Sequence, residues 1–192
     1  MKRVLAVAVV MLAMAQSPVW AGEAAAYKET KLGLYASALE TKAMLDKDSR
    51  AILIDVRDPT EIMFTGWAEE TDIHVPWILT DRSQFDAEKG AWKTVMNTKF
   101  EAQIAAALAA RGARPDDVIV VMCRSGATRS APAADVIAEM GYSKVYSMSD
   151  GFEGDTLKDG PSKGVRAVNG WRNSGLPWSY KSKPDIAWID TP

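Results

Sequence analysis

One stretch of the chain reads Val118-Ile119-Val120-Val121-Met122-Cys123-Arg124-Ser125-Gly126-Ala127-Thr128-Arg129-Ser130. Its first five residues are apolar and mostly β-branched, which is typical of a strand buried on both faces of a parallel sheet. A short turn follows, and residues 130–140 then show a helical pattern that ends at Gly141. The stretch therefore predicts a strand, a turn and a helix, with Cys123 at the carboxyl end of the strand.

The turn after this strand combines a candidate nucleophile with the features of an anion-binding loop. Ligands of open α/β sheets bind at the carboxyl ends of the strands, where loop amides and a helix N-terminus favour negative charge. We therefore expect the thiol of Cys123 to have a lowered pKa and to be the catalytic nucleophile. Two arginines add positive charge to the loop, and a glycine lets its backbone curl around the cysteine. The predicted substrate-binding residues are Arg124, Ser125, Gly126, Ala127, Thr128 and Arg129.

The composition limits what else this site can be. Cys123 is the only cysteine and His74 the only histidine, so an internal disulfide and a Cys/His zinc site built from this chain alone are excluded. No metal and no cofactor are predicted, and we expect His74 to find its hydrogen-bond partners locally. The formal net charge of −2 gives no indication of a nucleic-acid or membrane-surface partner. A buried structural cysteine is the alternative interpretation of Cys123.

The rest of the chain predicts an α/β fold. Short apolar runs at 51–54 and 145–148 indicate further buried strands, and helical patterns cover 37–45 and 100–111. This alternation of strands and helices favours a parallel sheet with helices on both faces. Residues 77–97 show no clean period, and we expect them to be mostly loop.

The N-terminus has the pattern of an exported protein. Lys2 and Arg3 precede an apolar run over 4–15, and a signal-peptidase site follows at Ala21, with Ala15 as the second choice. We expect residues 1–21 to be a cleaved signal peptide and the mature protein to be periplasmic, without a membrane attachment. An uncleaved anchor is the alternative, although the run of about 12 residues is shorter than the roughly 20 that span a bilayer.

Four motifs in order resemble those of the rhodanese family of sulfurtransferases. They are Ile54-Asp55-Val56-Arg57 with Glu61, Cys123-Arg124-Ser125-Gly126, Met140-Gly141-Tyr142 followed by Asp150-Gly151-Phe152, and Gly170-Trp171 with the Gly175-Leu176-Pro177 ending. The resemblance covers roughly residues 37–180. It implies a three-layer α/β fold with a central five-stranded parallel sheet, flanked by helices on both faces. It also implies that a persulfide of Cys123 carries sulfane sulfur from thiosulfate or a similar donor to a thiophilic acceptor.

The resemblance also implies where the domain begins and ends, which partners it has and which residues support the loop. We expect a lead-in over 22–36, the rhodanese-like domain over 37–180 with an insertion at about 155–168, and a tail over 181–192. The implied partners are a small anionic sulfur donor and a thiol or cyanide acceptor, and a periplasmic redox or sulfur-oxidation protein is a candidate acceptor. Structural support of the loop base, rather than catalysis, is expected of three residues, Asp55, Arg57 and Glu61. Trp171 is expected to pack the last helix onto the sheet.

Two alternatives remain open. Cys123 and Arg129 are separated by five residues, one more than in the usual rhodanese loop, and this spacing resembles dual-specificity phosphatases of the cell-cycle type and related arsenate reductases. Phosphatases of this kind usually have a histidine before the cysteine, where this chain has Met122, and no general acid can be assigned. The first alternative is a cysteine-dependent phosphatase or arsenate reductase. The second is a non-catalytic rhodanese-like domain that binds a partner.

Overall fold

The computed structural model describes residues 29–126 and 128–190. The predicted signal peptide at 1–21, the beginning of the predicted lead-in and the loop residue Ala127 lie outside this part of the chain. Among the described residues, no helix combines the length and the apolar composition that crossing a membrane requires.

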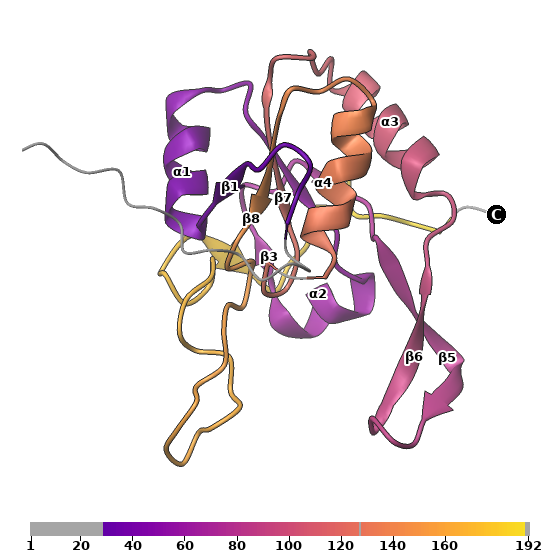
Figure 1. Cartoon of the computed structure of the whole chain (residues 1–192), viewed down its shortest axis with the longest axis vertical. Coiled ribbons are helices and arrows are strands. Elements are labelled where there is room, and N and C mark those ends of the chain that lie inside the picture. The colour runs from indigo at the N-terminus through magenta and orange to yellow at the C-terminus, as the bar shows by residue number, and fades with distance from the viewer. Residues whose placement is uncertain (1–28, 127, 191–192) are drawn as a thin grey trace, which may run out of the picture.

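Within the described residues, five parallel strands form the central sheet, which confirms the predicted fold (Figure 1). Their spatial order is β1 (Tyr35–Ala36), β8 (Lys144–Met148), β7 (Val118–Met122), β2 (Ile52–Asp55) and β4 (Ile73–His74). The strand that precedes Cys123 is therefore central, between β8 and β2. The last two residues of the predicted lead-in form the edge strand β1. A strand of two residues has no pattern that a sequence could reveal.

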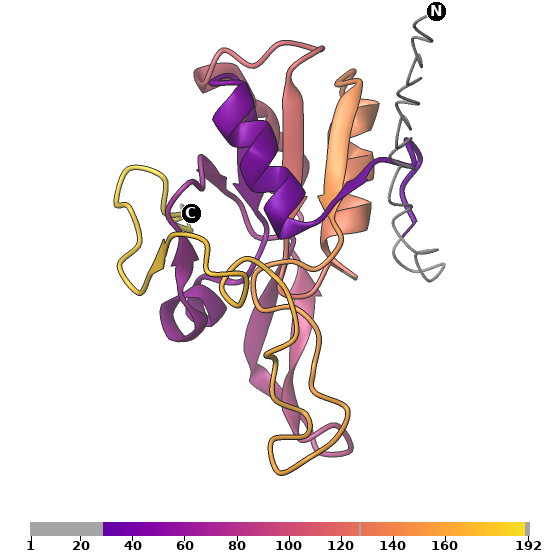
Figure 2. The same ribbon diagram turned by 90° about the vertical axis from the view of Figure 1, so that its left-hand side faces the viewer.

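Helices cover both faces of this sheet (Figures 1 and 2). On one side lies α1 (Ala38–Lys47), and on the other lie α3 (Phe100–Ala110) and α4 (Ser130–Glu139). Each face of the sheet has its own hydrophobic core, and alternate residues of β2 point into one or the other. Ile52 and Ile54 pack with α3 and α4, whereas Leu53 packs on the α1 side. Continuous apolar strands are therefore needed for a sheet with two buried faces.

The region of Trp171 differs from the prediction. The chain there forms turns, so the tryptophan packs no helix onto the sheet. Its fully buried indole instead joins the α1-side core with Phe152 and Leu53, and its Nε1 donates to the carbonyl of Pro177 at 2.8 Å. The backbone around it approaches the segment after β8: the amide of Trp171 donates to the carbonyl of Gly151 at 2.8 Å, and a Cβ on Gly170 would lie 2.5 Å from the amide nitrogen of Gly154.

Two short elements close the carboxyl end of the sheet. The helix α2 (Pro59–Thr65) begins at its N-cap Asp58, and its first residue is a proline. It leads into β3 (Trp67–Ala68), which pairs antiparallel with β9 (Trp178–Ser179) near the end of the chain. This pairing brings the C-terminal segment back beside α2.

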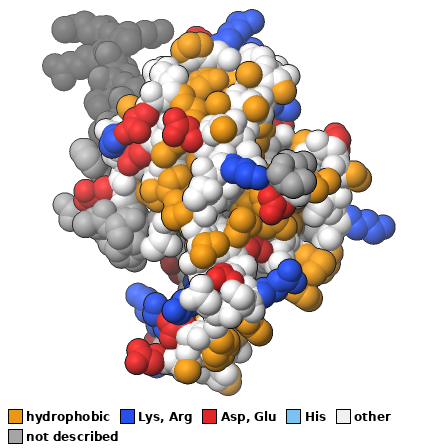
Figure 3. All heavy atoms as spheres, turned by 90° about the vertical axis from the view of Figure 1, so that its right-hand side faces the viewer, with side chains coloured by type: hydrophobic (Ala, Val, Ile, Leu, Met, Phe, Trp, Pro, Cys, Tyr) orange, Lys and Arg blue, Asp and Glu red, His pale blue; other side chains and the backbone are white. Residues whose placement is uncertain are grey.

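The prediction that residues 77–97 are mostly loop is wrong. This segment forms a long β-hairpin of β5 (Ile78–Asp86) and β6 (Ala91–Met96). Every residue of the two strands is exposed or half-buried, so the sequence has no alternation of buried and exposed positions. A register shift between Asp81 and Phe85 disturbs the remaining pattern. The face of the molecule that carries α3 and this hairpin exposes many hydrophobic side chains (Figure 3).

The predicted insertion forms an irregular loop that projects from the same end of the sheet as the hairpin (Figures 1 and 2). Its two ends are clamped together. The amide of Asp155 donates to Oδ1 of Asn169 at 2.7 Å, and Nδ2 of Asn169 donates back to the Asp155 carboxylate at 3.1 Å. A single β-bridge between Thr156 and Arg166 continues this contact outward.

Candidate active site

Cys123 directly follows β7 and is almost completely buried, with 2% of its surface exposed. Its Sγ lies 3.4 Å from the hydroxyl oxygen of Ser130, the first residue of α4. The hydroxyl of Ser147, on β8, donates to the same oxygen at 2.9 Å. Two buried serines thus form a chain of hydrogen bonds that ends at the sulfur. The sequence gives no signal for this role of either serine, because they are 17 residues apart and meet only where α4 packs against β8.

The surroundings lower the pKa of the Cys123 thiol. Burial by itself raises this pKa, because a thiolate is poorly solvated in the interior. The positive charge of Arg129, the hydroxyl of Ser130 and the backbone amides of Ser125 and Ser130 act in the opposite direction and outweigh it. The site therefore stabilises a thiolate, the nucleophilic form of cysteine.

Residues 149–154, which follow β8, pack against the cysteine loop at residues 123–126. The amide of Phe152 donates to the carbonyl of Cys123 at 2.8 Å. Glycine is required on both sides of the contact: a Cβ on Gly126 would lie 2.2 Å from the backbone of Ser149, and one on Gly151 would lie 2.6 Å from the carbonyl oxygen of Cys123. Both glycines also have positive φ angles. The loop and this segment therefore form one closely packed unit.

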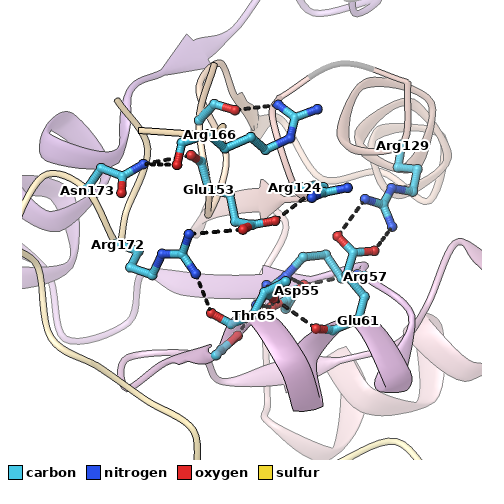
Figure 4. Close-up of polar contacts among 12 residues, drawn as sticks. Asp55, Arg57, Glu61, Thr65, Arg124, Arg129, Glu153, Arg166, Arg172 and Asn173 are labelled. Atoms are coloured by element: carbon cyan, nitrogen blue, oxygen red, sulfur yellow. Dashed lines mark hydrogen bonds and ion pairs between the residues drawn. The ribbon is translucent and has the colours of Figure 1, made fainter. Parts of the chain in front are cut away.

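The two arginines of the loop have different partners (Figure 4). Arg129 is largely buried and directs Nη1 and Nη2 at the two carboxylate oxygens of Glu61, on α2, at 2.6 and 3.0 Å. The side chain of Arg124 is 46% exposed and, in the part of the chain that the structure describes, it donates only through Nε, to the buried carboxylate of Glu153 at 2.6 Å. Glu153 also accepts a bond of 3.0 Å from Arg172. Glu153 was not predicted from the sequence, where its one signal is an acidic residue at the end of the glycine turn.

Among the described contacts, the side chains of Asp55 and Arg57 bind each other and do not touch Sγ of Cys123. They are completely buried and form an ion pair of 2.6 Å. The Arg57 guanidinium also donates to the carbonyl of Gly66 and stacks over the ring of Phe152, with 4.0 Å to the ring centroid. Through Phe152, this pair supports the segment that holds the cysteine loop.

The remaining predicted residues lie around this centre. Thr128 is exposed, and Ala127 lies outside the described residues. His74 is buried; its Nε2 lies 2.9 Å from the carbonyl of Arg57, and its Nδ1 accepts from the amide of Trp188. Within 29–126 and 128–190, no cluster of three or more His, Cys, Asp or Glu side chains is arranged to hold a metal ion.

Known proteins resemble this chain in sequence and in fold. The family model of the rhodanese-like domain matches residues 37–157. A protein of Rickettsia rickettsii described as uncharacterized is 30% identical over 142 residues, which is 73% of this chain and 94% of the relative. The crystal structure of Rv0390 from M. tuberculosis superposes with a TM-score of 0.56 at 29% identity, over 77% of this chain and 99% of that one. A solution structure of a polysulfide-sulfur transferase homodimer from Wolinella succinogenes has a TM-score of 0.45 at 23% identity, over 76% and 77% of the two chains.

Proposed function

Because the chain belongs to the rhodanese-like domain family, we propose that it is a sulfurtransferase that carries sulfane sulfur as a persulfide on Cys123. One observation carries the proposal: the only thiol of the chain lies at the carboxyl end of the central strand with a lowered pKa. It faces backbone amides and a guanidinium, which are groups that stabilise a thiolate and a bound anion.

We propose thiosulfate as the donor, because the backbone amides and the guanidinium around Cys123 favour a small anion. The Cys123 thiolate attacks the outer sulfur of thiosulfate, and a bond forms between Sγ and that sulfur. The sulfur–sulfur bond of thiosulfate breaks, and its electron pair leaves with sulfite. One thiolate and one thiosulfate dianion thus give one persulfide anion and one sulfite dianion, so that charge and atoms balance without an oxidant.

The second half-reaction needs no other cysteine of this chain. A thiol or cyanide attacks the outer sulfur of the persulfide and restores the Cys123 thiolate. We place this exchange in the periplasm, with a redox or sulfur-oxidation protein as the acceptor, on the basis of the N-terminal pattern of residues 1–21. N-terminal sequencing of protein from the periplasmic fraction tests this location, and an intact Met1 in the cytoplasm would exclude it.

Intact-protein mass spectrometry after exposure to thiosulfate tests the chemistry. We expect the mass to increase by one sulfur atom, and subsequent cyanide to reverse the increase and release thiocyanate. The Cys123→Ser variant should remain folded and show no increase. Folded wild-type protein that takes up no sulfur from any sulfane donor would leave the non-catalytic alternative as the better interpretation.

The phosphatase alternative uses the same thiolate and is tested by the same variant. Its loop spacing is present, but both Nη atoms of Arg129 are bonded to Glu61. We therefore expect aryl phosphates to be hydrolysed poorly. Rapid hydrolysis that disappears in Cys123→Ser would favour the phosphatase instead.

A further inference from the structure

One residue far along the chain fixes both the backbone and the side chain of Arg124. The amide of Glu153 donates to the carbonyl of Arg124 at 2.8 Å, and the carboxylate of Glu153 accepts from Nε of Arg124 at 2.6 Å. The side chain of Glu153 is 7% exposed, whereas that of Arg124 is 46% exposed. A buried and immobile carboxylate thus orients a guanidinium that reaches the surface (Figure 4).

The contact uses only one of the three nitrogens of this guanidinium. Among the described residues, no hydrogen-bond partner contacts Nη1 or Nη2 of Arg124. Arg129 shows the opposite pattern, with both Nη atoms bonded to Glu61. Of the two loop arginines, Arg124 is therefore the one whose outer pair of nitrogens can bind two oxygens of an anion side by side.

The local charge also favours an anion at Arg124. Glu153 alone would neutralise it, but Arg172 donates to the other oxygen of the same carboxylate at 3.0 Å. The three side chains together carry one net positive charge. This charge lies at the exposed end of the cluster, on the residue next to the nucleophile.

We propose that Glu153 is a positioning residue that aims Arg124 at the sulfonate group of the donor, and that the site thereby selects thiosulfate and organic thiosulfonates. This inference rests on the proposed function. The outer sulfur of such a donor must reach the buried Cys123, so its sulfonate end lies toward the exposed Arg124. The sulfite or sulfinate that leaves then departs past a guanidinium that is already oriented to receive it.

Two donors that differ only in this group make the test specific. In thiosulfate the leaving group is an oxyanion, and in a small alkyl hydropersulfide it is an alkyl thiolate without oxygen atoms. In Glu153→Gln, we expect kcat/KM for thiosulfate to fall about tenfold, the loss that a charge-assisted hydrogen bond typically gives, while kcat/KM for the hydropersulfide stays unchanged. An equal fall for both donors would overturn the inference.

A double-variant cycle shows whether Glu153 acts through Arg124. We expect Arg124→Gln to lose as much thiosulfate activity as Glu153→Gln, and the double variant to be no slower than Arg124→Gln alone. Multiplying losses would mean that Glu153 acts independently of Arg124 and would contradict the proposal.

Two controls separate positioning from stability. Glu139→Gln makes the same chemical change at an exposed ion pair with Lys31, and should leave both donors unaffected. Gly112→Ala strains a residue with a φ of +68° where an added Cβ meets no atom within 4 Å, and should lower Tm without changing the ratio of the two donors. If wild-type Cys123 gains no sulfur from either donor, the proposed function itself fails. If Cys123 is loaded but the donor ratio is the same in wild type and Glu153→Gln, only this inference fails.

Discussion

Arg129 holds the carboxylate of Glu61 with both of its Nη atoms, at 2.6 and 3.0 Å, and so joins the start of α4 to α2. The carboxylate and the thiolate both raise the pKa of the Arg129 guanidinium, more than its burial lowers it. The arginine is thus fixed in place by Glu61, and its positive charge still acts on the Cys123 thiolate. Its main effect on Cys123 is electrostatic.

Replacing this charge should make the nucleophile less acidic. In Arg129→Met, we expect the pKa of Cys123 to rise, because Arg129 is the strongest of the groups that lower it. The rate of iodoacetamide alkylation as a function of pH measures this pKa, and with one cysteine the signal has a single origin. Arg124→Met is the matched control, because Arg124 is not among the groups with the largest effects on this pKa. The same alkylation midpoint in both variants would contradict the electrostatic role.

The buried serines predict a graded effect on the same pKa. In Ser130→Ala the sulfur loses its hydroxyl partner, and we expect the alkylation midpoint to move upward, because this hydroxyl lowers the pKa of Cys123. Ser147→Ala removes only the bond that supports Ser130 and should move the midpoint less. A larger effect at Ser147 than at Ser130 would show that the hydrogen-bond chain is assigned incorrectly.

Alanine substitutions at two glycines with similar φ angles distinguish the cost of backbone strain from the cost of a steric clash. Gly112 and Gly126 have φ angles of +68° and +64°, but a Cβ on Gly112 meets no atom within 4 Å, whereas one on Gly126 meets the backbone of Ser149. Urea denaturation should show that Gly112→Ala costs about 1–2 kcal/mol of unfolding free energy, from the left-handed conformation alone. Gly126→Ala should cost more and should also slow the alkylation of Cys123. Equal costs would mean that Ser149 moves away without strain.

His74 should make stability depend on pH. Burial lowers the pKa of this ring, more than the carboxylate of Asp55 and the carbonyl of Arg57 raise it. The unfolded chain therefore takes up a proton below about pH 6.5 while the folded ring stays neutral, so the stability present above this pH is lost as the pH falls. A protonated ring also cannot accept the bond from the Trp188 amide at Nδ1.

The His74→Gln variant isolates this effect, since an amide can accept from Trp188 and donate to Arg57 without titrating. We expect the Tm of the wild type to fall more than that of the variant between about pH 7.5 and pH 5.5. Buried carboxylates such as Asp72 and Asp150 titrate in both proteins, so they do not contribute to the difference between them. Parallel losses of Tm would show that His74 is not the titrating group.

The sequence predicted best the parts of the fold that burial dictates. The strand before Cys123 and the helix after it were predicted because a sheet with two covered faces needs continuous apolar strands. The hairpin was missed for the converse reason, since its strands have no buried face. The partner of Arg124 was missed because Glu153 lies 29 residues away, and only the path of the chain after β8 brings the two together. Local pattern thus predicted the nucleophile, and tertiary contacts show that the two arginines have different partners.

The clamp between Asp155 and Asn169 lets the length and sequence of the inserted loop vary. Because the two ends of this loop already meet, the chain between them can be lengthened or shortened without moving the residues that hold Cys123. Each doubling of its length would cost only about 0.6 kcal/mol in closure entropy. A peptide epitope or a reporter group grafted between residues 156 and 166 would therefore leave in place both the clamp at Asp155 and Asn169 and the segment that packs against Cys123.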